Sequence, residues 1–195
     1  MASNALIYAL EMGSLPCLQS LSFDWTYDPQ DMNTTDRVVQ ALIDFAPGLR
    51  QLTLKAIHVL SAVCFPLMRV LINDVWPELT SLSLDFFHEN APGCDIYPEM
   101  VAGVKRNPGG GIAGIVAALE LPGTAKQLTS LTLVCPLNID FCSRLASAFT
   151  RGACPRLKEF VVHKDIYKCS IKEVKRALKG RAVVRAYGEE STWDM

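Results

Sequence analysis

The chain has 195 residues, half of them hydrophobic and 20% charged, and its formal net charge is −1. This composition suffices for one compact domain with an apolar core and excludes overall disorder. The longest apolar stretch, residues 56–72, is interrupted by His58, Pro66 and Arg69, so no bilayer-spanning helix is expected there. The first residues lack a basic segment and include Glu11, which argues against a secretory signal.

The chain begins with a predicted helix over residues 5–12. It serves either as a helical cap or as the helix of a preceding repeat in a longer array.

A leucine motif, Pro-x-Leu-x-x-Leu-x-Leu, then recurs along the chain. Its five copies start from Leu18, Leu49, Leu79, Leu128 and Leu157, at steps of 31, 30, 49 and 29 residues, and the fourth copy lacks the proline. A step near 30 residues indicates one structural unit used repeatedly. Within each copy the Leu-x-Leu alternation predicts a short strand with one apolar face.

Helical patterns separate the predicted strands. Thr34 or Thr35 caps a helix with its apolar side at Val38, Val39, Leu42 and Ile43. Pro66 is predicted to open a helix over 67–73, because proline suits a first helical turn. A further helix is predicted over 112–121. Another has its apolar side at Phe141, Cys142, Leu145, Ala148 and Phe149 and stops at Gly152. The last helix has Ile171, Val174 and Leu178 on one face, a capping box at Ser170 and Glu173 and a stop at Gly180, and a sixth strand is predicted over 182–187.

The 49-residue step contains about 20 residues more than the repeat needs. The excess falls near residues 88–111, where prolines and glycines are dense, and it predicts an inserted loop. Such an insertion is either a partner-contacting loop or a tolerated excursion.

These five copies resemble leucine-rich repeat proteins, and the repeat length with a helical second half resembles the ribonuclease-inhibitor-like class. The resemblance covers residues 15–187 and implies a single-domain α/β solenoid with parallel strands on the concave face and helices on the convex face. That family usually places Asn or Cys two or three residues beyond the last motif leucine, and here only Cys135 matches.

In-register stacking of the strands would place their outward side chains in three rows, small and polar over the first four strands. Proteins of this build bind partners on that surface, so we expect a non-catalytic module that binds another protein, in the manner of an adaptor. The candidate partner-binding residues are Ser20, Ser22, Asp24, Trp25, Gln51, Thr53, Lys55, Ser81, Ser83, Asp85, Ser130, Thr132, Glu159 and His163.

The alternative is a charge-driven binder that uses the basic region 151–185. This region holds eleven basic and three acidic residues, whereas residues 1–50 hold two basic and six acidic ones. Lys172, Lys175, Arg176 and Lys179 have helical spacing and form a predicted basic patch. Such a patch attracts an acidic protein or, less favoured here, a nucleic acid, because the interleaved aromatic residues of a single-strand binder are few.

Other chemistry is not favoured. Gly109–Gly114 has the spelling of a dinucleotide-binding turn but no buried strand before it, and Asp28, Asp31, Asn33 and Asp36 lack the glycine and closing glutamate of a calcium loop. We expect no metal, no cofactor and no enzymatic activity. The seven cysteines are odd in number with no Cys-x-x-Cys pair, which indicates buried thiols rather than disulfides and a protein of the cytoplasm or the nucleus.

Overall fold

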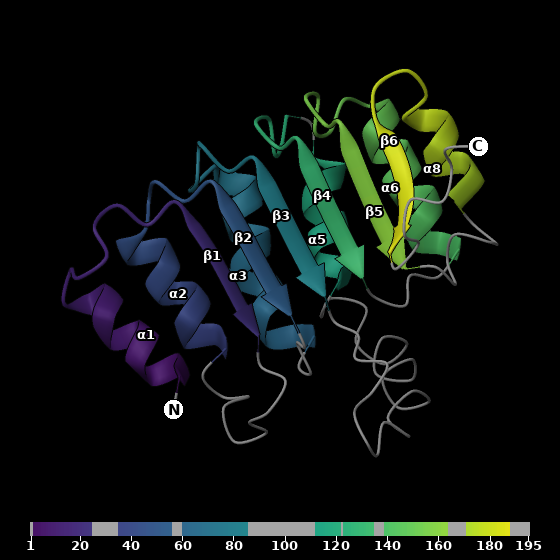
Figure 1. Ribbon diagram of the computed structural model, residues 1–195. Coiled ribbons are helices and arrows are strands. Elements are labelled where there is room, and N and C mark those ends of the chain that lie inside the picture. The colour runs from purple at the N-terminus through teal and green to yellow at the C-terminus, as the bar shows by residue number, and fades with distance from the viewer. Residues whose placement is uncertain are drawn as a thin grey trace, which may run out of the picture.

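The computed structural model describes residues 2–24, 35–55, 60–85, 112–121, 123–134, 139–163 and 171–187. They form a two-layer α/β arrangement, with a single parallel sheet and a row of helices on one of its faces (Figure 1). The elements in chain order are α1 (Ala2–Glu11), β1 (Ser20–Asp24), α2 (Thr35–Phe45), β2 (Gln51–Lys55), α3 (Leu60–Asn73), β3 (Ser81–Asp85), α5 (Ile112–Glu120), β4 (Ser130–Val134), α6 (Ile139–Thr150), β5 (Glu159–His163), α8 (Ile171–Ala177) and β6 (Val183–Tyr187).

The six strands lie in the sheet in their order along the chain. Each neighbouring pair is parallel, and equivalent motif residues lie opposite one another, as in Leu21↔Leu52 and Leu131↔Phe160. The predicted strands, including the sixth, and their predicted register are therefore confirmed. The long step between the third and fourth copies leaves this register unchanged, since Leu82 lies opposite Leu131.

The core lies between the sheet and the helices. The motif residues that point toward the helices are at most 1% exposed in β2 to β5: Leu52, Leu54, Leu82, Leu84, Leu131, Leu133, Phe160 and Val162. The predicted apolar sides of α2, α6 and α8 meet them, and the rings of Phe149 and Phe160 pack edge to face with centroids 5.5 Å apart. Burial of these side chains is the main favourable term in the folding free energy.

A tight turn precedes each of the first five strands and explains the motif proline. The N–H group of the first motif leucine donates to the carbonyl three residues earlier at 3.0–3.2 Å, as in Leu49 to Ala46 and Leu79 to Trp76. The proline occupies the second position of this turn, where its fixed φ is favourable and its missing N–H is not needed. In the fourth copy Lys126 takes that position.

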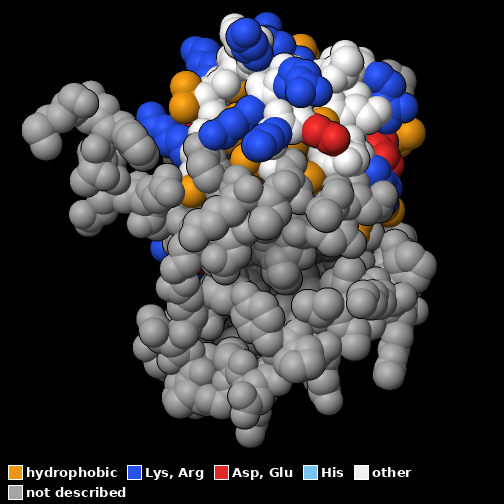
Figure 2. Space-filling model, turned by 90° about the vertical axis from the view of Figure 1, so that its right-hand side faces the viewer, with side chains coloured by type: hydrophobic (Ala, Val, Ile, Leu, Met, Phe, Trp, Pro, Cys, Tyr) orange, Lys and Arg blue, Asp and Glu red, His pale blue; other side chains and the backbone are white. Residues whose placement is uncertain are grey.

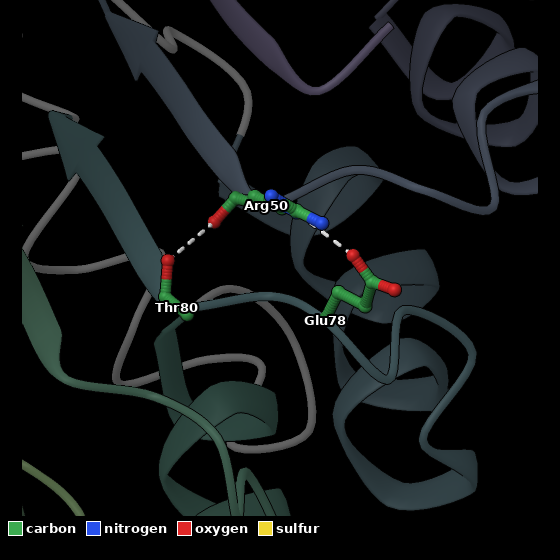
Figure 3. A network of polar contacts seen from close by, with 3 residues as sticks. All are labelled: Arg50, Glu78 and Thr80. Carbon is green, nitrogen blue, oxygen red and sulfur yellow. Dashed lines mark hydrogen bonds and ion pairs between the residues drawn. The ribbon is translucent and has the colours of Figure 1, made fainter. Parts of the chain in front are cut away.

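A backbone ladder joins each turn to the next. The N–H groups of Thr80 and Ser81 both donate to the Arg50 carbonyl, and the equivalent groups of later copies repeat this pattern at 2.8–3.1 Å. The Thr80 hydroxyl also donates to the Arg50 carbonyl, while the Arg50 Nε donates to Glu78 at 2.8 Å (Figure 3). These contacts fix the spacing between neighbouring turns at the amino-terminal end of the strands.

A residue with left-handed backbone follows most of the helices. Gly152 (φ 95°) and Gly180 (φ 78°) confirm the two predicted helix stops. After α3 the same position is held by Asp74 (φ 53°), and the Val75 N–H donates to the Val70 carbonyl across it. An aspartate there is more strained than a glycine, because its Cβ crowds the following carbonyl.

Two predictions are wrong. Helix α3 begins at Leu60 and contains Pro66 in its interior, because packing of α3 between α2 and α5 outweighs the preference of proline for a first turn. Cys17 is exposed in its turn rather than buried, whereas Cys142 and Cys154 are buried free thiols as expected.

The predicted loop 88–111, which includes Gly109–Gly111 of the glycine motif, and the aspartates of residues 28–33 lie outside the described residues, whereas Ile112 to Gly114 of that motif form the start of α5. None of the described helices combines the length and apolar character needed to cross a bilayer.

Candidate partner-binding face

The face of the sheet opposite the helices carries the candidate residues, and among the described elements no helix covers it (Figure 1). Two of the three predicted rows are continuous across the strands. The first row is Ser20, Gln51, Ser81, Ser130, Glu159 and Val183, and the second is Ser22, Thr53, Ser83, Thr132, Val161 and Arg185. The alternation of each strand places these side chains opposite the buried leucines.

Exposure differs along these rows. Ser20 and Ser22 of β1 and Arg185 of β6 are exposed, whereas the residues of β3 and β4 are half-buried. The middle strands therefore present small, half-buried hydroxyl side chains, and the outer strands β1 and β6 present more exposed ones.

Polar contacts connect neighbouring strands within the first row. The Ser20 hydroxyl donates to Gln51 Oε1 at 3.3 Å, and the Ser130 hydroxyl donates to Glu159 Oε2 at 3.4 Å. Arg185 of β6 lies 3.5 Å from the other oxygen of Glu159. These contacts are exposed or partly so, and a partner can replace them at little cost because water already competes for the same groups.

The third predicted row is only partly available. Asp24 and Lys55 are exposed, but Asp85 is 9% exposed and Val134 is 1% exposed. Asp85 therefore offers little of its side chain to a partner, and its place among the binding residues stays a prediction. Alternation along a strand determines which face a side chain points to, but not what packs against it there. Trp25 and the side chain of His163 lie outside the described residues.

The predicted basic patch lies on and just after α8, in the last unit of the sheet, next to the edge strand β6. Lys172, Lys175, Arg176 and Lys179 are all exposed; α8 carries the first three, and Lys179 follows it. Figure 2 shows Lys and Arg side chains gathered over this end of the molecule. Glu173, on the same helix, accepts a hydrogen bond from Ser143 of α6 at 2.8 Å.

Arg181 has a structural role that the sequence analysis missed. Its guanidinium donates to the carbonyls of Phe149 at 2.8 Å, Cys154 at 3.0 Å and Ala153 at 3.2 Å. These carbonyls belong to the end of α6 and the turn after it, and those of Phe149 and Cys154 also accept from the N–H groups of Gly152 and Leu157. Part of the positive charge counted in 151–185 thus holds the fold together. The only sequence signal was a base directly after the helix-stop Gly180.

The buried thiols are poor candidates for chemistry. Burial raises the pKa of Cys142 to about 11, with a further contribution from Glu173, and it raises the pKa of Cys154 to about 12 despite the opposing charge of Arg181. Neither thiol is a thiolate at neutral pH, and a thiolate is what a cysteine nucleophile requires. In the described part of the chain, no three His, Cys, Asp or Glu side chains cluster as a metal site would require.

Comparison with known proteins adds no relative. No known family model, curated protein or solved structure matches this chain.

Proposed function

We propose that the protein is a leucine-rich-repeat-like solenoid that binds another protein, without catalysis, on the concave strand face. Three features support the solenoid: the repeated turn, the sequential parallel order of the strands, and the helices on one side. Each unit leaves its apolar side to be covered by the next, as in repeat proteins of this kind.

The single observation that carries the binding proposal is the pair of in-register polar rows on the open face. Neighbouring strands lie about 4.8 Å apart, so the hydroxyl groups of Thr53, Ser83 and Thr132 repeat at a regular spacing. Small side chains let a partner approach the sheet closely while donors and acceptors remain available. Charged residues at the two ends, Asp24 and Arg185, can orient the partner.

The test is affinity capture with the full chain, followed by a purified binding measurement with each captured protein. The face variant Thr53→Arg with Ser83→Arg fills the middle of the face without touching the core. The matched control, Asn73→Arg with Ser147→Arg, adds the same groups to exposed positions of the helix layer. We expect the face variant to lose at least about tenfold in affinity and the control to lose none. Equal binding by both variants would place the site elsewhere.

A second candidate function is charge-driven binding of an acidic protein or a nucleic acid, and the gathering of basic side chains in Figure 2 favours it. Reversal at Lys172→Glu and Lys179→Glu should abolish such binding, and affinity should fall steeply with added salt. Affinity that does not change with salt would reject this candidate.

A further inference from the structure

Among the described residues, the apolar ladder of the sheet is less completely buried in the two outer strands than in the inner ones. The inward residues of β2 to β5 are at most 1% exposed, but the equivalent Leu21 and Phe23 of β1 and Val184 of β6 are only partly buried, while Ala186 of β6 is 5% exposed. In the outward row of β6, Val183 is 55% exposed. In the described part of the chain, each outer strand thus leaves apolar side chains that an adjoining strand and helix would cover.

The two ends also carry opposite charge. Residues 2–24, which form α1, β1 and their connection, contain Glu11 and Asp24 and no lysine or arginine. Residues 171–187, which form α8, β6 and their connection, contain six basic residues and the single acid Glu173.

Helix geometry directs the positive charge toward the open end. Glu173 reaches Ser143, so that side of α8 faces α6. With about 100° between successive residues, Lys172 and Lys175 lie on the side of α8 turned away from α6, and Lys179 follows the end of the helix. That side is the end of the helix layer, which is the surface in view in Figure 2.

The opposite end of the helix layer is α1, and its solvent-facing side is apolar and acidic. Tyr8 is 64% exposed and Met12 is 62% exposed, four residues apart and opposite the buried Ile7 and Leu10. Glu11 is exposed beside them. Tyrosine and methionine are enriched in protein interfaces, and lysine stems pack well against such groups.

We propose that this protein associates head to tail with a second copy of itself, through the basic end of one copy and the acidic end of the next. The edge of β6 adds to the edge of β1 in the parallel register of the inner strands, with Val183 opposite Ser20 and Arg185 opposite Ser22. Helix α8 then lies beside α1, its lysines near Glu11 and Tyr8. The contact joins two different surfaces, so it extends into open chains of copies.

The test is sedimentation velocity of the full chain over a concentration series at low and high salt. We expect species larger than a monomer, whose fraction rises with protein concentration and falls as salt is added. A chain that stays monomeric under all these conditions would overturn the proposal. Failure of this test would leave the proposed function of the strand face untouched, since the end variants do not alter that face.

Two charge variants test the direction of the contact. Tyr8→Lys with Glu11→Lys alters the acidic end, and Lys172→Glu with Lys179→Glu alters the basic end. Each alone should weaken association at least about tenfold, because truncating or reversing central interface groups costs this much or more. Mixing the two should restore association, because each supplies the end that the other lacks.

All substituted residues are exposed, and circular dichroism would confirm that both variants fold. The control Asn73→Lys with Ser147→Lys should associate as the unaltered chain does. Undiminished association of either end variant, or failure of the mixture to recover, would contradict a head-to-tail contact.

Discussion

The two faces of the sheet are built from alternate residues of the same strands, yet they differ in what they contribute. On the helix side, Leu52 and Leu131 are almost completely buried in one continuous core. On the other side, Thr53 and Thr132, which directly follow these leucines in the sequence, remain half-exposed. Stability is therefore concentrated on one face, and substitutions on the second face should cost the fold little.

The largest expected effect is a loss of stability on the helix side. Leu131→Ala removes a side chain from the middle of the core and leaves a cavity, so the free energy of unfolding should fall by about 2–5 kcal/mol. Urea unfolding followed by circular dichroism measures this change. A loss well below this range would mean that the ladder is not the principal core.

An intermediate effect is expected where one side chain supports the frame of the sheet. Arg181→Met removes three charge-assisted hydrogen bonds to carbonyls near the end of α6, at a cost of about 1–3 kcal/mol. The matched control is Arg185→Met, whose ion pair with Glu159 is exposed and is worth about 1 kcal/mol or less. Equal unfolding midpoints for the two variants would show that Arg181 does not support this turn.

A pH-dependent effect is expected between α5 and α6. Arg144 donates to both oxygens of Glu120, at 2.8 and 2.6 Å, and this hydrogen bonding holds the pKa of Glu120 below its ordinary value despite some opposing desolvation. A lowered pKa means that the stabilisation is present above the unfolded pKa and is lost as the pH falls through the folded one.

Glu120→Gln should therefore lower the free energy of unfolding by about 1 kcal/mol at neutral pH. The difference from the unaltered chain should shrink as acid protonates the carboxyl group, which urea titrations at several pH values would measure. A difference that persists unchanged in acid would mean that the ion pair is not its source.

The smallest effect is expected on the open face. Ser83→Ala removes one hydroxyl group from a half-exposed position, and the unfolding free energy should change by no more than about 0.5 kcal/mol. A thermal or urea transition would record this. A large loss would show that the open face contributes to folding as the helix side does, and the contrast between the faces would fail.

The sequence predicts the sheet well because its pattern is local and repeated. A fixed alternation such as Leu82-Ser83-Leu84 sets both the buried side and the register, since slipping by one residue would expose every leucine. Helix stops at Gly152 and Gly180 are equally local signals.

The features that the sequence did not predict depend on tertiary surroundings. Pro66 lies inside α3 because α2 and α5 pack against that helix. Asp85 is buried at the end of β3, although its position in the alternation predicts an open side chain. The role of Arg181 requires carbonyls at the end of α6 to lie beside it, and a base directly after Gly180 does not by itself specify that contact. For the candidate binding face, the sequence pattern predicted the rows of side chains, but only the structure shows how exposed each of these side chains is.

The order of the strands has a consequence for how the chain acquires its structure. Among the described elements, every extensive contact joins consecutive strands or neighbouring helices, so each of these units needs only the one made before it. During synthesis, α1 to β3 can assemble while later residues are still on the ribosome. The pairing of β4 with β3 must wait for the longest connection, from Asp85 to Ser130, but this delay is modest because doubling a loop costs only about 0.6 kcal/mol.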